Sequence, residues 1–129
     1  MLKHILFIED EPDIQLIVMA SLQNFGGYEV LACSCGEEAL QKATGFKADL
    51  ILLDVMMPVM DGPTTLSKLR QLSHYAKLPA VFMTAKIQPN EVAELLGFGA
   101  AEVIAKPFDP LLLSAKLKKI YEDYHIDKL

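Results

Sequence analysis

Short hydrophobic runs that stop at a polar residue recur along this chain, and they constrain its fold more than any other feature. The runs 5–8, 50–53, 81–83 and 103–105 are followed by Glu9 and Asp10, by Asp54, by Thr84 and by Lys106, respectively. Continuous apolar runs of this length are typical of strands that are buried on both faces of a sheet. If the strands are parallel, their carboxyl ends lie along one edge, and the polar residues should meet there.

Segments with helical signals separate the strands. Pro12 suits the first turn of a helix that would end at Gly26–Gly27, and Asp109–Pro110 predicts the cap and first residue of a last helix. The pattern Ser34-x-x-Glu37 predicts a capping box for the second helix. The expected strands are 3–8, 28–33, 49–53, 79–83 and 102–105, with a helix after each. Five such units in a row predict a parallel sheet with right-handed crossovers and helices on both faces.

The chain has the size and composition of one globular domain, so we expect a single domain over residues 1–129. Hydrophobic residues make up 52% of it and charged residues 22%, which excludes a disordered chain. The net charge is −5 and there is no basic stripe, so direct binding to nucleic acid is not expected. No apolar stretch approaches the roughly 20 residues that span a bilayer. The first strand also begins too early to leave room for a signal peptide, so we expect a cytoplasmic protein.

The polar residues at the strand ends have the chemistry needed to handle a phosphoryl group. Three carboxylates, from Glu9, Asp10 and Asp54, would lie close together, and like charges this close need compensation. Mg²⁺ supplies it, because this ion takes oxygen ligands and keeps further positions for water and phosphate oxygens. Asp54 would then attack phosphorus and become an aspartyl phosphate. Lys106 and Thr84 would contact the phosphoryl oxygens.

Four motifs, in this order and at these separations, are similar to those of the receiver domains of two-component response regulators. They are Ile8-Glu9-Asp10-Glu11-Pro12, Leu53-Asp54-Val55-Met56-Met57-Pro58-Val59-Met60-Asp61-Gly62, Thr84-Ala85 and Lys106-Pro107-Phe108. The resemblance covers essentially the whole chain. It implies an α/β fold of the flavodoxin-like type, a doubly wound five-stranded parallel sheet of order 2-1-3-4-5 with five helices.

The resemblance also implies roles for the site residues. Asp54 would accept a phosphoryl group from a histidine kinase or a histidine phosphotransfer protein, with Thr84 and Lys106 as its catalytic partners. Mg²⁺, or Mn²⁺ in its place, would be held by Glu9, Asp10, Asp54 and the backbone carbonyl of Met56. The Lys106–Pro107 peptide bond would be cis. The chain would phosphorylate and dephosphorylate itself without turnover on an external substrate, signal to a downstream protein, and be a monomer or a weak, phosphorylation-dependent dimer.

Three positions depart from the usual pattern of these domains. Many members carry an aromatic residue where this chain has Val103, and a valine cannot act as an aromatic rotamer switch. We therefore expect a muted conformational response to phosphorylation. Met56 and Lys86 flank the path of a water that would attack the phosphoryl group, and neither side chain is suited to orient it. This predicts a long-lived phosphoryl group.

Other interpretations fit parts of the sequence. The chain could be a pseudo-receiver that binds partners without phosphorylation, or a receiver cut from a longer regulator. An aspartyl-phosphate hydrolase would have a second acid where Met56 stands. A flavin carrier of the same fold would have a loop rich in Ser, Thr and Gly after the first strand, where the acidic segment 9–12 lies instead.

Overall fold

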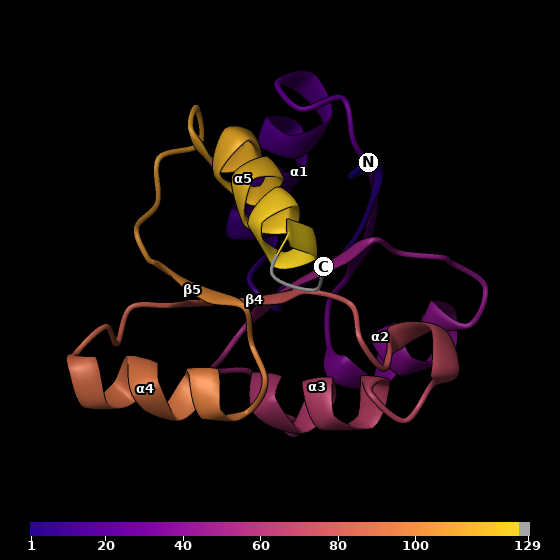
Figure 1. Ribbon diagram of the computed structural model, residues 1–129, viewed down its shortest axis with the longest axis vertical. Coiled ribbons are helices and arrows are strands. Elements are labelled where there is room, and N and C mark those ends of the chain that lie inside the picture. The colour runs from indigo at the N-terminus through magenta and orange to yellow at the C-terminus, as the bar shows by residue number, and fades with distance from the viewer. Residues whose placement is uncertain (127–129) are drawn as a thin grey trace.

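The computed structural model describes residues 1–126, and its centre is a parallel sheet with the strand order β2-β1-β3-β4-β5 (Figure 1). The strands are β1 (His4–Ile8), β2 (Glu29–Cys33), β3 (Leu50–Asp54), β4 (Ala80–Thr84) and β5 (Glu102–Ala105). The helices are α1 (Pro12–Asn24), α2 (Gly36–Ala43), α3 (Gly62–Leu69), α4 (Pro89–Gly97) and α5 (Leu113–Ile126). The predicted fold class and strand order are therefore confirmed, and strand boundaries differ from the prediction by about one residue.

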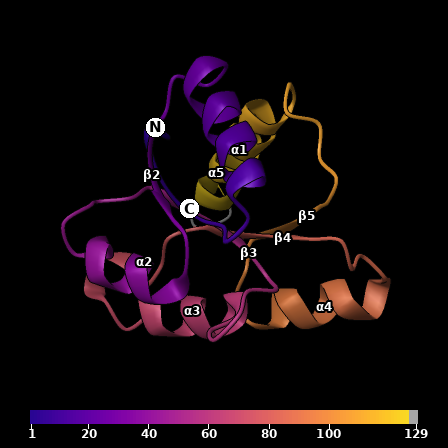
Figure 2. The same cartoon turned by 180° about the vertical axis from the view of Figure 1, so that it is seen from behind.

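Helices cover both faces of the sheet. The two opposite views show α1 and α5 on one face and α2, α3 and α4 on the other (Figures 1 and 2). Side chains alternate along each strand, so every inner strand contributes to two cores. The core under α2–α4 contains Leu6, Ile8, Ile51, Leu53 and Phe82, and the core under α1 and α5 contains Ile5, Phe7, Leu50, Leu52 and Val81. No helix within residues 1–126 is long and apolar enough to cross a membrane.

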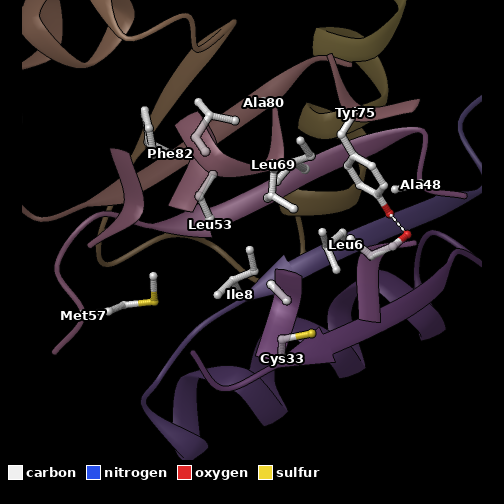
Figure 3. Close-up of a cluster of buried hydrophobic side chains, with 14 of the residues drawn as sticks. Leu6, Ile8, Cys33, Ala48, Leu53, Met57, Leu69, Tyr75, Ala80 and Phe82 are labelled. Carbon is white, nitrogen blue, oxygen red and sulfur yellow. Dashed lines mark hydrogen bonds between the residues drawn. The ribbon is translucent and has the colours of Figure 1, made fainter. Parts of the chain in front are cut away.

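A buried tyrosine ties the end of α2 to the approach to β4. Tyr75 lies in a 3₁₀ turn at Ser73–Tyr75, at the edge of the core shown in Figure 3. Its hydroxyl oxygen lies within hydrogen-bonding distance of two carbonyl oxygens, that of Ala43 at 3.0 Å and that of Phe46, which share its single proton. The turn was not predicted, because a single helical turn has no hydrophobic period to reveal it.

The cap of α2 lies one residue later than the Ser34-x-x-Glu37 pattern predicts. The N-cap is Cys35, whose sulfur accepts from the backbone N–H of Glu38 at 3.5 Å. The Glu38 carboxylate accepts from the N–H of Ser34 at 2.6 Å, one residue before the N-cap, whereas the acidic residue of a capping box accepts from the N–H of the N-cap itself. A hydrogen bond from Lys42, and then that from Ser34, lowers the pKa of Glu38. The predicted box was wrong because it did not allow for a sulfur acceptor.

The last helix begins later than predicted. Pro110 does not open α5, which starts at Leu113. A turn comes first, in which the Asp109 carboxylate accepts from the N–H of Leu111 at 2.9 Å. The N–H of Leu112 donates to the Asp109 carbonyl at 3.1 Å. Asp109 thus caps the turn that precedes the helix, and does not cap the helix itself.

Candidate functional site

The predicted site residues stand at the carboxyl ends of the strands. Asp54 and Thr84 are the last residues of β3 and β4, and Glu9 and Lys106 directly follow β1 and β5. Neighbouring strands pair in parallel, so these ends lie along one edge of the sheet. β3 and β4 are buried over their whole length, which fixes the direction of the side chains at their ends.

Three carboxylates form one cluster at this edge. Single oxygen atoms of Glu9, Asp10 and Asp54 all lie within 4.8 Å of one another. Glu9 is fully buried, Asp54 is 5% exposed and Asp10 is half-buried. Like charges so close cannot all stay ionised unless a cation compensates them.

Lys106 supplies part of the compensating charge. Its Nζ lies 2.9 Å from Glu9 Oε1 and 2.9 Å from Asp54 Oδ1, and it donates a hydrogen bond to each. Burial by itself would lower the pKa of Lys106, but the hydrogen bonds to Asp54 and Glu9 outweigh it and the pKa is raised. Burial raises the pKa of Glu9, and the hydrogen bond from Lys106 offsets this only in part. The single ammonium of Lys106 does not balance three carboxylates, so the cluster retains excess negative charge.

The chemistry of the cluster fits a small divalent cation. Hard oxygen ligands and uncompensated negative charge are the conditions that Mg²⁺ and Mn²⁺ prefer. Glu9, Asp10 and Asp54 are thus brought together as the sequence predicts. Met56 lies in the loop after β3 with an exposed side chain. That its backbone carbonyl binds the metal stays a prediction. The metal-binding and catalytic roles of the other site residues also stay predictions.

The loop between β3 and α3 lies directly against the backbone of Asp54. The N–H of Gly62 donates to the carbonyl of Val55 at 2.8 Å, and the Asp61 carboxylate caps α3 through the N–H of Thr64 at 2.8 Å. A Cβ at Gly62 would lie 2.3 Å from the carbonyl oxygen of Asp54, closer than real contacts allow. The Asp-Gly pair of the sequence motif therefore has a steric reason as well as a capping one.

Thr84 and Lys106 are linked through the backbone of β4 and β5. The N–H of Lys106 donates to the carbonyl of Thr84 at 2.9 Å, while the Thr84 hydroxyl accepts from the N–H of Lys86 at 3.0 Å. The hydroxyl thus faces the loop after β4, at the strand end next to Asp54. The Lys106–Pro107 peptide bond is cis, as the resemblance implies.

Val103 is half-buried and packs against the core under α2–α4. The expected muted response to phosphorylation stays a prediction. A large change of amide exchange confined to residues 85–104 after phosphorylation would contradict it.

Gln15 is a residue near the site that the sequence patterns did not single out. Its side-chain nitrogen lies 3.2 Å from the carbonyl oxygen of Glu9 and 3.3 Å from that of Cys33. A signal for it was present: Gln15, Val18 and Leu22 share one helical stripe, and the other two are buried. A polar residue on a core-facing stripe indicates a specific hydrogen-bonding role.

Comparisons with known proteins agree with this geometry. A family model described as the response regulator receiver domain matches residues 5–118. The alkaline phosphatase synthesis transcriptional regulatory protein PhoP of Bacillus subtilis is 39% identical over 118 residues, which are 92% of this chain and 48% of that protein. Response regulator SaeR of Staphylococcus epidermidis is 35% identical over 107 residues, 83% of this chain and 45% of that protein. The chain thus spans about half the length of these curated relatives.

Solved structures show the same similarity. Chemotaxis response regulator CheY4 of Vibrio cholerae superposes with a TM-score of 0.85 at 33% identity, covering 93% of this chain and 99% of that one. The receiver domain of sensor histidine kinase PA1611 from Pseudomonas aeruginosa has a TM-score of 0.79 at 28% identity, covering 96% and 98%. That structure is described with a magnesium ion coordinated in its active-site cleft.

Proposed function

This chain belongs to the response regulator receiver domains of two-component signalling, and from that membership we propose that it accepts a phosphoryl group on Asp54. The observation that carries the proposal is the surroundings of this carboxylate. Asp54 is nearly buried, lies in the cluster with Glu9 and Asp10, and has the ammonium of Lys106 at 2.9 Å. A nucleophile, an acidic cation site and a fixed positive charge are the parts that phosphoryl transfer needs.

The proposed reaction moves a phosphoryl group from a histidine of a kinase or phosphotransfer protein. A carboxylate oxygen of Asp54 attacks phosphorus, the P–N bond to the donor imidazole breaks, and the leaving nitrogen keeps the electron pair of that bond. Lys106, already in contact with Asp54, neutralises charge on the phosphoryl oxygens. The Thr84 hydroxyl, which accepts from Lys86, would donate its proton to a phosphoryl oxygen.

Glu9, Asp10, Asp54 and the carbonyl of Met56 are the proposed ligands of Mg²⁺ or Mn²⁺. When bound, the ion supplies the positive charge that the cluster lacks and that the incoming phosphoryl oxygens require. The proposal is supported by the excess negative charge of the cluster, and by the magnesium ion described for the similar PA1611 domain.

The output of the domain is proposed to be protein–protein contact. Phosphorylation adds a charge of about −1.5 to −2 at the edge of the sheet and biases an equilibrium between two conformations. We propose a cytoplasmic location, residues 1–129 as one domain, and a monomer or weak phosphorylation-dependent dimer. A histidine kinase or phosphotransfer protein is the donor, and a downstream protein is the target.

Intact-mass measurement after incubation with a small phosphodonor and Mg²⁺ tests this function. We expect a single phosphoryl adduct that is absent in Asp54→Asn and absent when EDTA removes the metal. Asp123→Asn is the matched control, since Asp123 is an exposed aspartate of α5 that pairs with Lys119, and its adduct should equal that of the wild type. No adduct in the wild-type protein would favour the pseudo-receiver instead.

The lifetime of the phosphoryl group gives a second prediction. Met56 and Lys86 are both exposed next to the site; the lysine has no acceptor for an attacking water, and the methionine sulfur is only a weak one. Met56→Asn and Lys86→Glu should each speed the loss of the adduct by about tenfold, less than the roughly 10²–10⁴-fold that a fully positioned base contributes. The decay is followed by mass after the phosphodonor is removed.

Val59→Asn is the control for this measurement. Val59 lies in the same loop and is 98% exposed, and its φ of 69° suits asparagine better than valine. The variant places an amide in the same loop at a position to which the proposal assigns no contact with the attacking water. Equal decay in Met56→Asn, Lys86→Glu and wild type would show that these positions do not set the lifetime.

A further inference from the structure

The side chain of Gln15 bridges the segment that carries Glu9 and Asp10 to the end of the neighbouring strand β2. Its Nε2 reaches the carbonyl oxygen of Glu9, which directly follows β1, at 3.2 Å. The same nitrogen reaches the carbonyl oxygen of Cys33, the last residue of β2, at 3.3 Å. Gln15 itself belongs to α1, so one amide group joins a helix to the ends of two strands.

The contacts use the full donor capacity of this amide. Both neighbours are carbonyl oxygens, which can only accept, so the nitrogen of the Gln15 amide must face them, and its two N–H bonds serve one carbonyl each. The carbonyl of Cys33 also accepts from the N–H of Glu9 at 3.0 Å. Glu9 is thereby held at both its N–H and its C=O.

These bonds act on the backbone next to the proposed metal ligands. Glu9 and Asp10 are consecutive, so the orientation of the Glu9 carbonyl also fixes the peptide that leads into Asp10. The second carboxylate oxygen of Glu9 accepts from the N–H of Glu11 at 3.2 Å, which keeps the other one directed at Lys106. A loop held this closely presents its carboxylates in one geometry.

We propose that Gln15 is a positioning residue for the metal site: it holds the β1–α1 loop so that Glu9 and Asp10 face Asp54 in the arrangement that binds a divalent cation. The inference rests on the proposed metal-dependent function. Hydrogen-bonding partners behind metal ligands typically change metal affinity by about 10–100-fold when they are lost.

A packing role and a charge role predict different results. If Gln15 only filled space, Gln15→Met, which has nearly the same shape, would leave the affinity unchanged. If only local charge mattered, Gln15→Glu would bind the cation more tightly, because it adds a carboxylate near the cluster. A positioning role predicts weaker binding in both variants, since neither methionine nor glutamate can donate to the two carbonyls.

The test is titration with Mn²⁺ alone, followed by the EPR signal of the free ion, with competition by Mg²⁺ to identify the site. We expect affinity to fall about tenfold or more in Gln15→Met and in Gln15→Glu. Gln23→Met and Gln23→Glu are matched controls, because Gln23 is an exposed glutamine in the same helix. The Mn²⁺ affinities of these controls should differ from that of the wild type by no more than about twofold, which is much less than the loss expected for the Gln15 variants.

Amide exchange in the metal-free protein gives a second measurement. Loss of the Gln15 amide should speed exchange of the Glu9 and Glu11 N–H groups about tenfold or more, while the N–H of Val81 in β4 is unchanged and shows that the variant is folded. Unchanged Mn²⁺ affinity in Gln15→Met, or tighter binding in Gln15→Glu, overturns the inference alone. Absence of Mn²⁺ binding in the wild-type protein overturns the proposed metal site and the inference with it.

Discussion

Lys106→Met is expected to slow phosphoryl transfer to Asp54 by about 10²- to 10³-fold, the usual effect of removing one preorganised charge-stabilising donor. The ammonium contacts Glu9 and Asp54 at 2.9 Å in a site where only 14% of the Lys106 side chain is exposed. Little water is therefore available to replace it. The rate of adduct formation with a small phosphodonor at saturating Mg²⁺, followed by intact mass, measures the effect.

The same variant should be less stable when metal is absent. Glu9 and Asp54 would lose their contact with a cation, and removing one partner of a buried ion pair typically costs about 3–5 kcal/mol. Urea unfolding with EDTA at neutral pH measures this loss. Mg²⁺ should recover part of it, because a cation that binds only the folded state stabilises that state.

Lys86→Met is the matched control for Lys106→Met. Lys86 lies two residues after Thr84, the last residue of β4, and its side chain is exposed. The variant should unfold at the same urea concentration as the wild type and form the adduct at a similar rate. A Lys106→Met protein that is phosphorylated within a few-fold of the wild-type rate would contradict the role given to this ammonium.

Gly62→Ala is expected to lower the free energy of unfolding by about 1–3 kcal/mol, as overpacking of a well-filled site does. The new methyl group would lie 2.3 Å from the Asp54 carbonyl oxygen and 3.0 Å from the Val55 Cα, and both are backbone atoms that cannot rotate away. Either α3 or the end of β3 must move. Movement of β3 displaces the nucleophile, so adduct formation should also slow.

Gly97→Ala separates this clash from the general effect of adding a methyl group to a helix. Gly97 is the last residue of α4, and nothing lies within 4 Å of a Cβ placed there. The substitution should be neutral or stabilising by up to about 1 kcal/mol, because alanine favours helix more than glycine does. Urea unfolding gives the free energy of unfolding of both variants. A Gly62→Ala protein as stable as Gly97→Ala would contradict the prediction, because it would show that the loop accommodates the methyl group without loss of stability.

The parts of the fold that follow from repeated patterns could be predicted from the sequence. Each apolar run ends at a polar residue, so parallel pairing of the strands is enough to place Glu9, Asp54 and Lys106 along one edge of the sheet. Strand order does not follow from those runs. It came from the resemblance of the four motifs to a known family.

Features that depend on the exact direction of one side chain could not be predicted. The cap of α2 uses the sulfur of Cys35, and the bridge made by Gln15 joins a helix to a carbonyl 18 residues away. The partner of His4 is a further case, since its Nε2 lies 2.8 Å from the Glu29 carboxylate. That partner comes from the neighbouring strand, so only the paired sheet places it there.

The order of the strands also has a consequence for how the protein is made. The acidic cluster is supplied entirely by β1 and β3, which lie side by side and belong to the first 54 residues, whereas Lys106 follows the last strand. During synthesis the three carboxylates can therefore meet before their ammonium partner has been translated. A chain translated only as far as β3 therefore holds all three carboxylates without the ammonium that contacts two of them in the complete fold.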